Sequence, residues 1–164
     1  MYKRQTVDDI AKAIALDPKN KYHWFCTDYV TSSIAHLKLH EPQKALDDAN
    51  NAVKYRPKSD AAVGTGQVDL YGLYAYKTRA TANLELKNYS DALRDAQSAL
   101  SIDPNSYEIL GVKANALCGL QKYDEALSAI DEAIKISPET ESLKSDRDLI
   151  SKYKLQNSKQ SSSR

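Results

Sequence analysis

Two stretches of this chain repeat each other at one constant offset, and such a repeat constrains the fold more than any other feature. Residues 76–104 read YKTRATANLELKNYSDALRDAQSALSIDP, and residues 110–138 read LGVKANALCGLQKYDEALSAIDEAIKISP. The matched pairs are Ala80/Ala114, Tyr89/Tyr123, Ala92/Ala126, Ala99/Ala133, Ile102/Ile136 and Pro104/Pro138. A fixed period of this kind predicts stacked units, each too small to bury its own apolar face.

The residue types within each unit predict two antiparallel helices. The six repeated alanines allow two helices to approach closely, while the larger Leu93, Leu100, Leu127 and Ile134 fill the next layer. Pro18, Pro57, Pro104 and Pro138 end second helices, because the residue before a proline is pushed out of the α region. Pro42 is expected in the first turn of its helix, where a missing N–H costs nothing.

The period and these positions resemble the pattern of the tetratricopeptide-repeat (TPR) family, which places large, small, aromatic and proline residues at fixed points. The matching residues are Tyr76, Ala80, Ala92, Ala99 and Pro104 in one repeat, and Leu110, Ala114, Leu117, Ala126, Ile130, Ala133 and Pro138 in the next. The family's usual Trp is replaced by Tyr76 or Leu110, and its usual Gly by Ala80 or Ala114. The resemblance implies an all-α fold, a right-handed α-α superhelix with a C-terminal capping helix.

The repeat also predicts how the chain is divided. Residues 1–5 resemble the translated remnant of a sequencing adapter, and 6–18 resemble a half repeat whose first helix is missing, as in an N-terminally truncated fragment. Full repeats are expected at 21–57, 72–104 and 105–138, with an insertion at 58–71 that ends in a helix beginning near Gln67. Residues 139–155 are the expected capping helix, which completes a TPR domain at 6–155. Residues 156–164 are expected to be a disordered tail.

Composition and charge favour a cytoplasmic binding protein over other classes. Lys and Arg number 23 against 22 Asp and Glu, so no global positive field would attract nucleic acid or an anionic membrane. Cys26 and Cys118 have neither metal-site nor disulfide-framework spacing, which favours a reducing compartment. The apolar runs are too short to span a membrane. A monomer is expected, with self-association possible through the N-terminal end.

Four features could carry chemistry, and each has a simpler interpretation. His36 and His40 would share a helix face as in a zinc motif, but Leu37 stands where that motif has its glutamate. Gly64-Thr65-Gly66 lacks the GK[ST] of a phosphate loop, and Cys118 has no adjacent base. Trp24 is either a packing residue or an exposed anchor. The sequence therefore predicts a protein that is not an enzyme and that binds neither a metal nor a cofactor.

The resemblance places a partner-binding groove along the first helices of the repeats. The groove residues it implies are Tyr74, Lys77, Thr78, Thr81, Glu108, Val112 and Asn115, with Val30 and Ile34 in the first full repeat. Co-chaperones of this family clamp acidic chaperone tails with Lys, Arg and Asn, but here those places hold Val30, Ile34, Thr78, Glu108 and Val112. We therefore expect a scaffold for a peptide or partner helix, with a co-chaperone-like or assembly role but without that carboxylate clamp. The alternative is a regulatory or targeting fragment of a larger enzyme.

Overall fold

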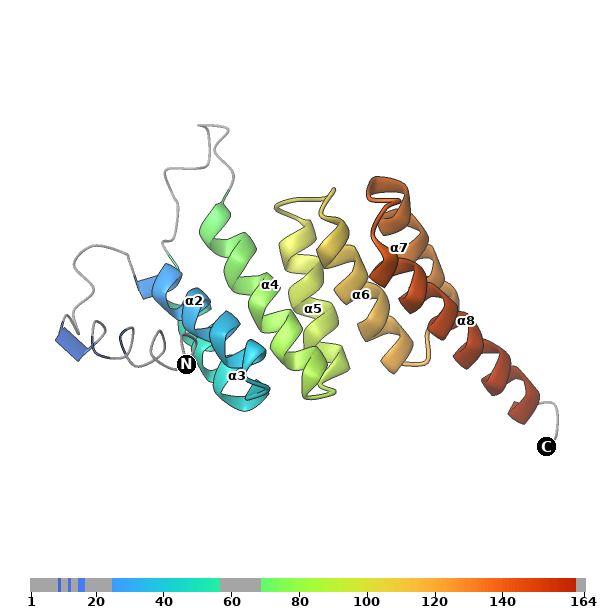
Figure 1. Cartoon of the computed structure of the whole chain (residues 1–164), viewed down its shortest axis with the longest axis horizontal. Coiled ribbons are helices and arrows are strands. Elements are labelled where there is room, and N and C mark those ends of the chain that lie inside the picture. Colours follow the sequence, from blue (N-terminus) through green and yellow to red (C-terminus); the bar gives the residue numbers. More distant parts are fainter. Residues whose placement is uncertain (1–8, 10–11, 13–14, 17–24, 57–68, 162–164) are drawn as a thin grey trace.

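The computed structural model describes residues 9, 12, 15–16, 25–56 and 69–161, and in these residues it contains helices and no strand (Figure 1). The helices are α2 (Phe25–Lys38), α3 (Pro42–Tyr55), α4 (Leu70–Glu85), α5 (Tyr89–Leu100), α6 (Tyr107–Gly119), α7 (Tyr123–Ile136) and α8 (Glu141–Ser161). Pro42 is the first residue of α3, as expected from its fixed φ and missing N–H.

The helices form two layers of a solenoid. α2, α4, α6 and α8 lie side by side in one layer, and each contacts the next (Figure 1). α3, α5 and α7 make up the other layer, where each packs against the helix before it and the helix after it. This arrangement confirms the all-α TPR solenoid predicted from the repeat.

The repeated small residues lie at the centre of each helix pair. Ala80, Ala92, Ala99, Ala114, Ala126 and Ala133 are all fully buried. Around them pack larger side chains, among them Leu93, Leu100, Leu127 and Ile134, which are half-buried. The close approach predicted for the two helices of each pair is therefore confirmed.

Each helix pair turns through a residue with positive φ. These residues are His40 at 58°, Lys87 at 62° and Gln121 at 61°. Lys87 and Gln121 lie one repeat period apart, so the same turn recurs in successive repeats. The amide after each turn residue donates back into the preceding helix, as Asn88 N does to Asn83 O at 2.8 Å. This left-handed end of a helix is normally a glycine position.

Three predictions need correction. α4 begins at Leu70 and not near Gln67, because the Asp69 carboxylate accepts a hydrogen bond from Gly72 N at 2.8 Å and caps the helix there. α2 ends at Lys38, so His40 lies in the turn and does not share a helix face with His36. Residues 156–161, expected in the disordered tail, continue α8 to Ser161, since no Gly or Pro interrupts the helix there.

Some predictions fall outside the described residues. They concern Trp24, the apolar stripe of Val7, Ile10 and Ile14, the Gly64-Thr65-Gly66 break and the prolines Pro18 and Pro57. Within the described residues, no helix combines the length and apolar character needed to cross a membrane.

Candidate functional site

The predicted groove residues lie on two neighbouring helices. Tyr74, Lys77, Thr78 and Thr81 belong to α4, while Glu108, Val112 and Asn115 belong to α6, which runs beside it (Figure 1). We use the term first-helix face for the surface made by the accessible side chains of these positions, together with Ile34 of α2 and Asp146, Leu149 and Tyr153 of α8.

Two polar contacts join adjacent helices across the first-helix face. The Lys77 ammonium of α4 forms an ion pair with the Glu108 carboxylate of α6. Asn115 Nδ2 of α6 donates to Asp146 Oδ2 of α8 at 3.0 Å. Both contacts join residues 31 apart, although they lie at different positions of the repeat. The donors of Lys77 and Asn115, which the sequence suggested for a partner, are therefore already engaged within the chain.

The two threonines contribute less to this face than the sequence suggested. Thr78 is 4% exposed, and its hydroxyl donates to Tyr74 O at 2.9 Å and Ala75 O at 3.1 Å. Thr81 is half-buried and donates in the same way to Lys77 O at 2.9 Å. Such bonds to the preceding turn satisfy the hydroxyl within its own helix. Thr78 thus supports the packing between helices and presents almost no surface to a partner.

Apolar side chains are the main accessible feature of the first-helix face. Tyr74 of α4 is 50% exposed, and Val112 of α6 is half-buried. On α8, Leu149 and Tyr153 are 45% and 43% exposed, although Leu143 and Ile150 of the same helix are buried. Exposed large apolar residues of this kind make the first-helix face a candidate contact surface.

Leu149 and Tyr153 were not among the predicted site residues. Both belong to residues 139–155, which the sequence predicted only as a capping helix. The repeat itself carried the signal for Leu149, which lies one repeat period after the predicted groove residue Asn115, and Tyr153 lies about one helical turn beyond Leu149. α8 packs against α6 as α6 packs against α4, so these side chains extend the first-helix face by one helix.

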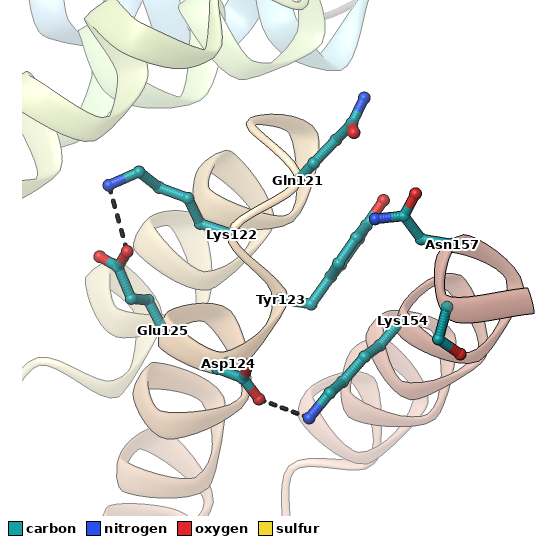
Figure 2. Close-up of a pocket in the computed structure, with 8 residues that line it drawn as sticks. Gln121, Lys122, Tyr123, Asp124, Glu125, Lys154 and Asn157 are labelled. Carbon is teal, nitrogen blue, oxygen red and sulfur yellow. Dashed lines mark hydrogen bonds and ion pairs between the residues drawn. The ribbon is translucent and has the colours of Figure 1, made fainter. Parts of the chain in front are cut away.

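A second surface feature, unpredicted from the sequence, is a pocket of about 360 Å³ between the start of α7 and the end of α8 (Figure 2). Tyr123 points toward Asn157 across this pocket. Its charged residues already form pairs, Lys122 with Glu125 at 3.1 Å and Lys154 with Asp124. The pocket therefore offers a ligand no unpaired charge.

The side chains that could carry chemistry are held in unreactive states. Burial, and then the nearby charge of Asp69, raises the pKa of Cys26 to about 11. Burial and the charge of Asp146 raise the pKa of Cys118, whereas a nucleophilic thiolate needs a lowered one. His36 is buried and bonds Glu41 Oε2 through Nδ1 at 2.8 Å. The described residues contain no group of three or more potential metal ligands.

Comparisons with known proteins agree with this geometry. A family model described as tetratricopeptide repeat matches residues 83–145. The first TPR domain of human RPAP3 has a similar structure, with a TM-score of 0.69 and 16% identity, over 84% of this chain and 98% of that one. The chain therefore has the fold of a TPR domain, and residues 83–145 match the family itself.

Two further TPR structures are similar. A C-terminal TPR-containing domain of a Plasmodium falciparum FK506-binding protein has a TM-score of 0.71 and 18% identity, over 84% of this chain and 93% of that one. The second TPR domain of human RPAP3, solved in complex with the HSP70 peptide SGPTIEEVD, has a TM-score of 0.64 and 16% identity, over 79% and 97% of the two chains. A search of curated proteins gives no match.

The five positions where TPR co-chaperones carry their carboxylate clamp provide no cation here. Val30 is buried against Cys26, Ala52 and Ala75, so its place is part of the core. Thr78 is buried as well, while Ile34, Glu108 and Val112 reach the surface. Lys77 is a nearby cation on this face, and Glu108 already neutralises it. These five positions therefore offer no cationic donor to a carboxylate.

Proposed function

We propose that this TPR domain is a protein-interaction scaffold that holds a peptide or a partner helix on its first-helix face. The observation that carries this proposal is the group of exposed Tyr74, Leu149 and Tyr153, together with half-buried Val112, on three neighbouring helices. The similar TPR domain of RPAP3 that holds an HSP70 peptide supports the choice of a peptide ligand. The absence of the clamp cations argues for a ligand anchored by apolar side chains.

Tyr74 is the anchor from which we expect the largest effect. Its ring is half-exposed on the rigid helix α4, and tyrosine provides a large amphipathic contact with little conformational freedom to lose. Lys77 is expected to matter less, because its charge is already compensated by Glu108. Its ion pair fixes the spacing between α4 and α6 more than it attracts a ligand.

Peptides selected from a phage-displayed random library against the immobilised domain would test the proposal. Their affinity should fall by about 1–3 kcal/mol when Tyr74 is replaced by Ala, whereas Lys77→Ala should cost less and mainly change the salt dependence. Arg94→Ala and Gln97→Ala on α5 are matched controls, because both side chains are exposed on a helix of the other layer. If the α5 variants weaken binding and the α4 variants do not, the assignment to the first-helix face is wrong.

A further inference from the structure

Asp146 differs from the other acidic side chains near the first-helix face. It is half-buried on α8, and its hydrogen bond in the structure comes from the neutral amide of Asn115. Among the described residues, it forms no ion pair with a cation. By contrast, Glu108, the other acid of the first-helix face, pairs with Lys77.

The carboxylate of Asp146 faces α6, where two observations place it. Asn115 donates to it, and its charge contributes to the raised pKa of Cys118, one turn further along α6. A carboxylate in such a partly dry position loses hydration, and one neutral amide replaces only part of what is lost. A cationic group brought by a partner would form a charge-assisted hydrogen bond there.

Apolar residues accompany Asp146 along α8 and stand at the matching position of α6. Val112 occupies on α6 the position that Asp146 occupies on α8, since the two are offset by one repeat period. Leu149 follows Asp146 by about one helical turn and Tyr153 by two, on the same side of α8. Long basic side chains suit such a site, because their aliphatic stems cover apolar surface while the charged end reaches an acid.

We propose that the partner segment carries a Lys or Arg flanked by apolar residues, and that Asp146 binds this cation. This inference rests on the proposed function, because it describes the ligand that the first-helix face would bind. The apolar residues of the segment pack on Val112, Leu149 and Tyr153, and the basic residue reaches between α6 and α8 to Asp146. The expected ligand is thus a basic and apolar segment, the opposite in charge of an acidic tail.

The test uses the peptides selected on the whole chain, which should contain a Lys or Arg next to apolar residues more often than the unselected library. Asp146→Asn keeps an acceptor for Asn115 and removes the charge, so it should weaken these peptides roughly five- to tenfold. Asp146→Glu keeps the charge and should stay within about threefold of the wild type. Asp148→Asn is the matched control on the same helix, because Asp148 is exposed, and it should change affinity less than about twofold.

A double-mutant cycle then connects the two charges. Replacing the basic residue of a selected peptide by Met should weaken binding to the wild type and have little further effect on the Asp146→Asn variant. Circular dichroism melting of each variant checks that the fold is intact.

The possible failures separate the two proposals. If the peptides need Tyr74 and Leu149 but show no preference for Lys or Arg, the proposed cation site is wrong and the scaffold function is still supported. The same holds if they bind the Asp146→Asn variant as tightly as the wild type. Peptides indifferent to Tyr74 and Leu149, or a selection that yields no binder, overturn both.

Discussion

The Arg79 guanidinium donates two hydrogen bonds to the carboxylate of Asp95, from Nε at 2.9 Å and from Nη2 at 2.7 Å. Asp95 is 2% exposed and also accepts a bond from Asn83 Nδ2 at 3.3 Å. The Arg79 pair joins α4 to α5, and a contact of 3.4 Å from Arg79 Nη1 to Asn50 Oδ1 reaches α3. One buried acid therefore organises the junction between the first two helix pairs.

Removing the charge of Asp95 should destabilise the domain strongly. Asp95→Asn leaves the guanidinium in a mostly buried position without its anion, and we expect a loss of about 2–4 kcal/mol in the free energy of unfolding. Urea denaturation followed by circular dichroism would measure it. Asp91→Asn is the control, because its pair with Arg94 is exposed and should contribute less than about 0.5 kcal/mol. Equal effects of the two substitutions would contradict the importance of the buried pair.

The positive φ angles of Lys87 and Gln121 predict that glycine is more stable at both positions. A side chain with a Cβ is strained in the left-handed region by about 1 kcal/mol, and glycine is not. Lys87→Gly and Gln121→Gly should each raise the free energy of unfolding by about 0.5–1 kcal/mol. Lys87→Ala and Gln121→Ala keep the strain and should show no such gain.

Gly119 should not tolerate even a methyl group. A Cβ built on Gly119 would overlap Cδ1 of the Tyr89 ring. Gly119→Ala should therefore lower the stability by about 1–3 kcal/mol, because α6 or the ring must shift. At Gly111 a Cβ would meet Leu143 Cδ2 at 3.1 Å, a softer contact at the end of a flexible side chain. Thermal melting should thus show a smaller effect for Gly111→Ala.

The fold was predictable because it depends on local pattern and a fixed period. The buried alanines such as Ala80 and Ala114 mark the contact between helices, and two copies one period apart fix the register. The predicted start of α4 was wrong because the helix begins where Gly72 N donates a capping hydrogen bond to the Asp69 carboxylate. The spacing of apolar residues does not indicate which side chain forms such a bond.

The site was only partly predictable, because it depends on how successive helix pairs are placed. Tyr74 and Val112 could be assigned to the face by their repeat position, but the pairing of Lys77 with Glu108 requires the distance between α4 and α6. The burial of Thr78 has the same origin. Leu149 was missed because an apolar residue on a capping helix has two possible environments, and only packing decides between them.

The pH dependence of stability should reveal the environment of Asp48. Burial raises its pKa above the ordinary value of 3.8, although a bond from Ser32 and the charge of His36 act in the opposite direction. An acid with a higher pKa in the folded state binds its proton more tightly there, so protonation favours folding. The stability of the wild type relative to Asp48→Asn should therefore rise as the pH falls from about 7 to about 4. The exposed neighbour gives the control, since Asp47→Asn should show no such trend.

Peptides that end in Glu-Glu-Val-Asp should bind this domain no tighter than roughly millimolar, about 4 kcal/mol of binding free energy. Glu108 would repel their carboxylates, and Asp146 adds a second negative charge on the same face. Replacing Glu108 by Lys and Val112 by Arg together puts cations at the two clamp positions of the last full repeat, and it also leaves Lys77 without its internal anion. This double variant should bind the acidic peptide at least about tenfold more tightly, with a strong dependence on salt. Isothermal titration calorimetry at two salt concentrations would measure both proteins. Micromolar binding by the wild type, lost on Tyr74→Ala, would show that the first-helix face accepts acidic tails without the clamp and would refute the prediction.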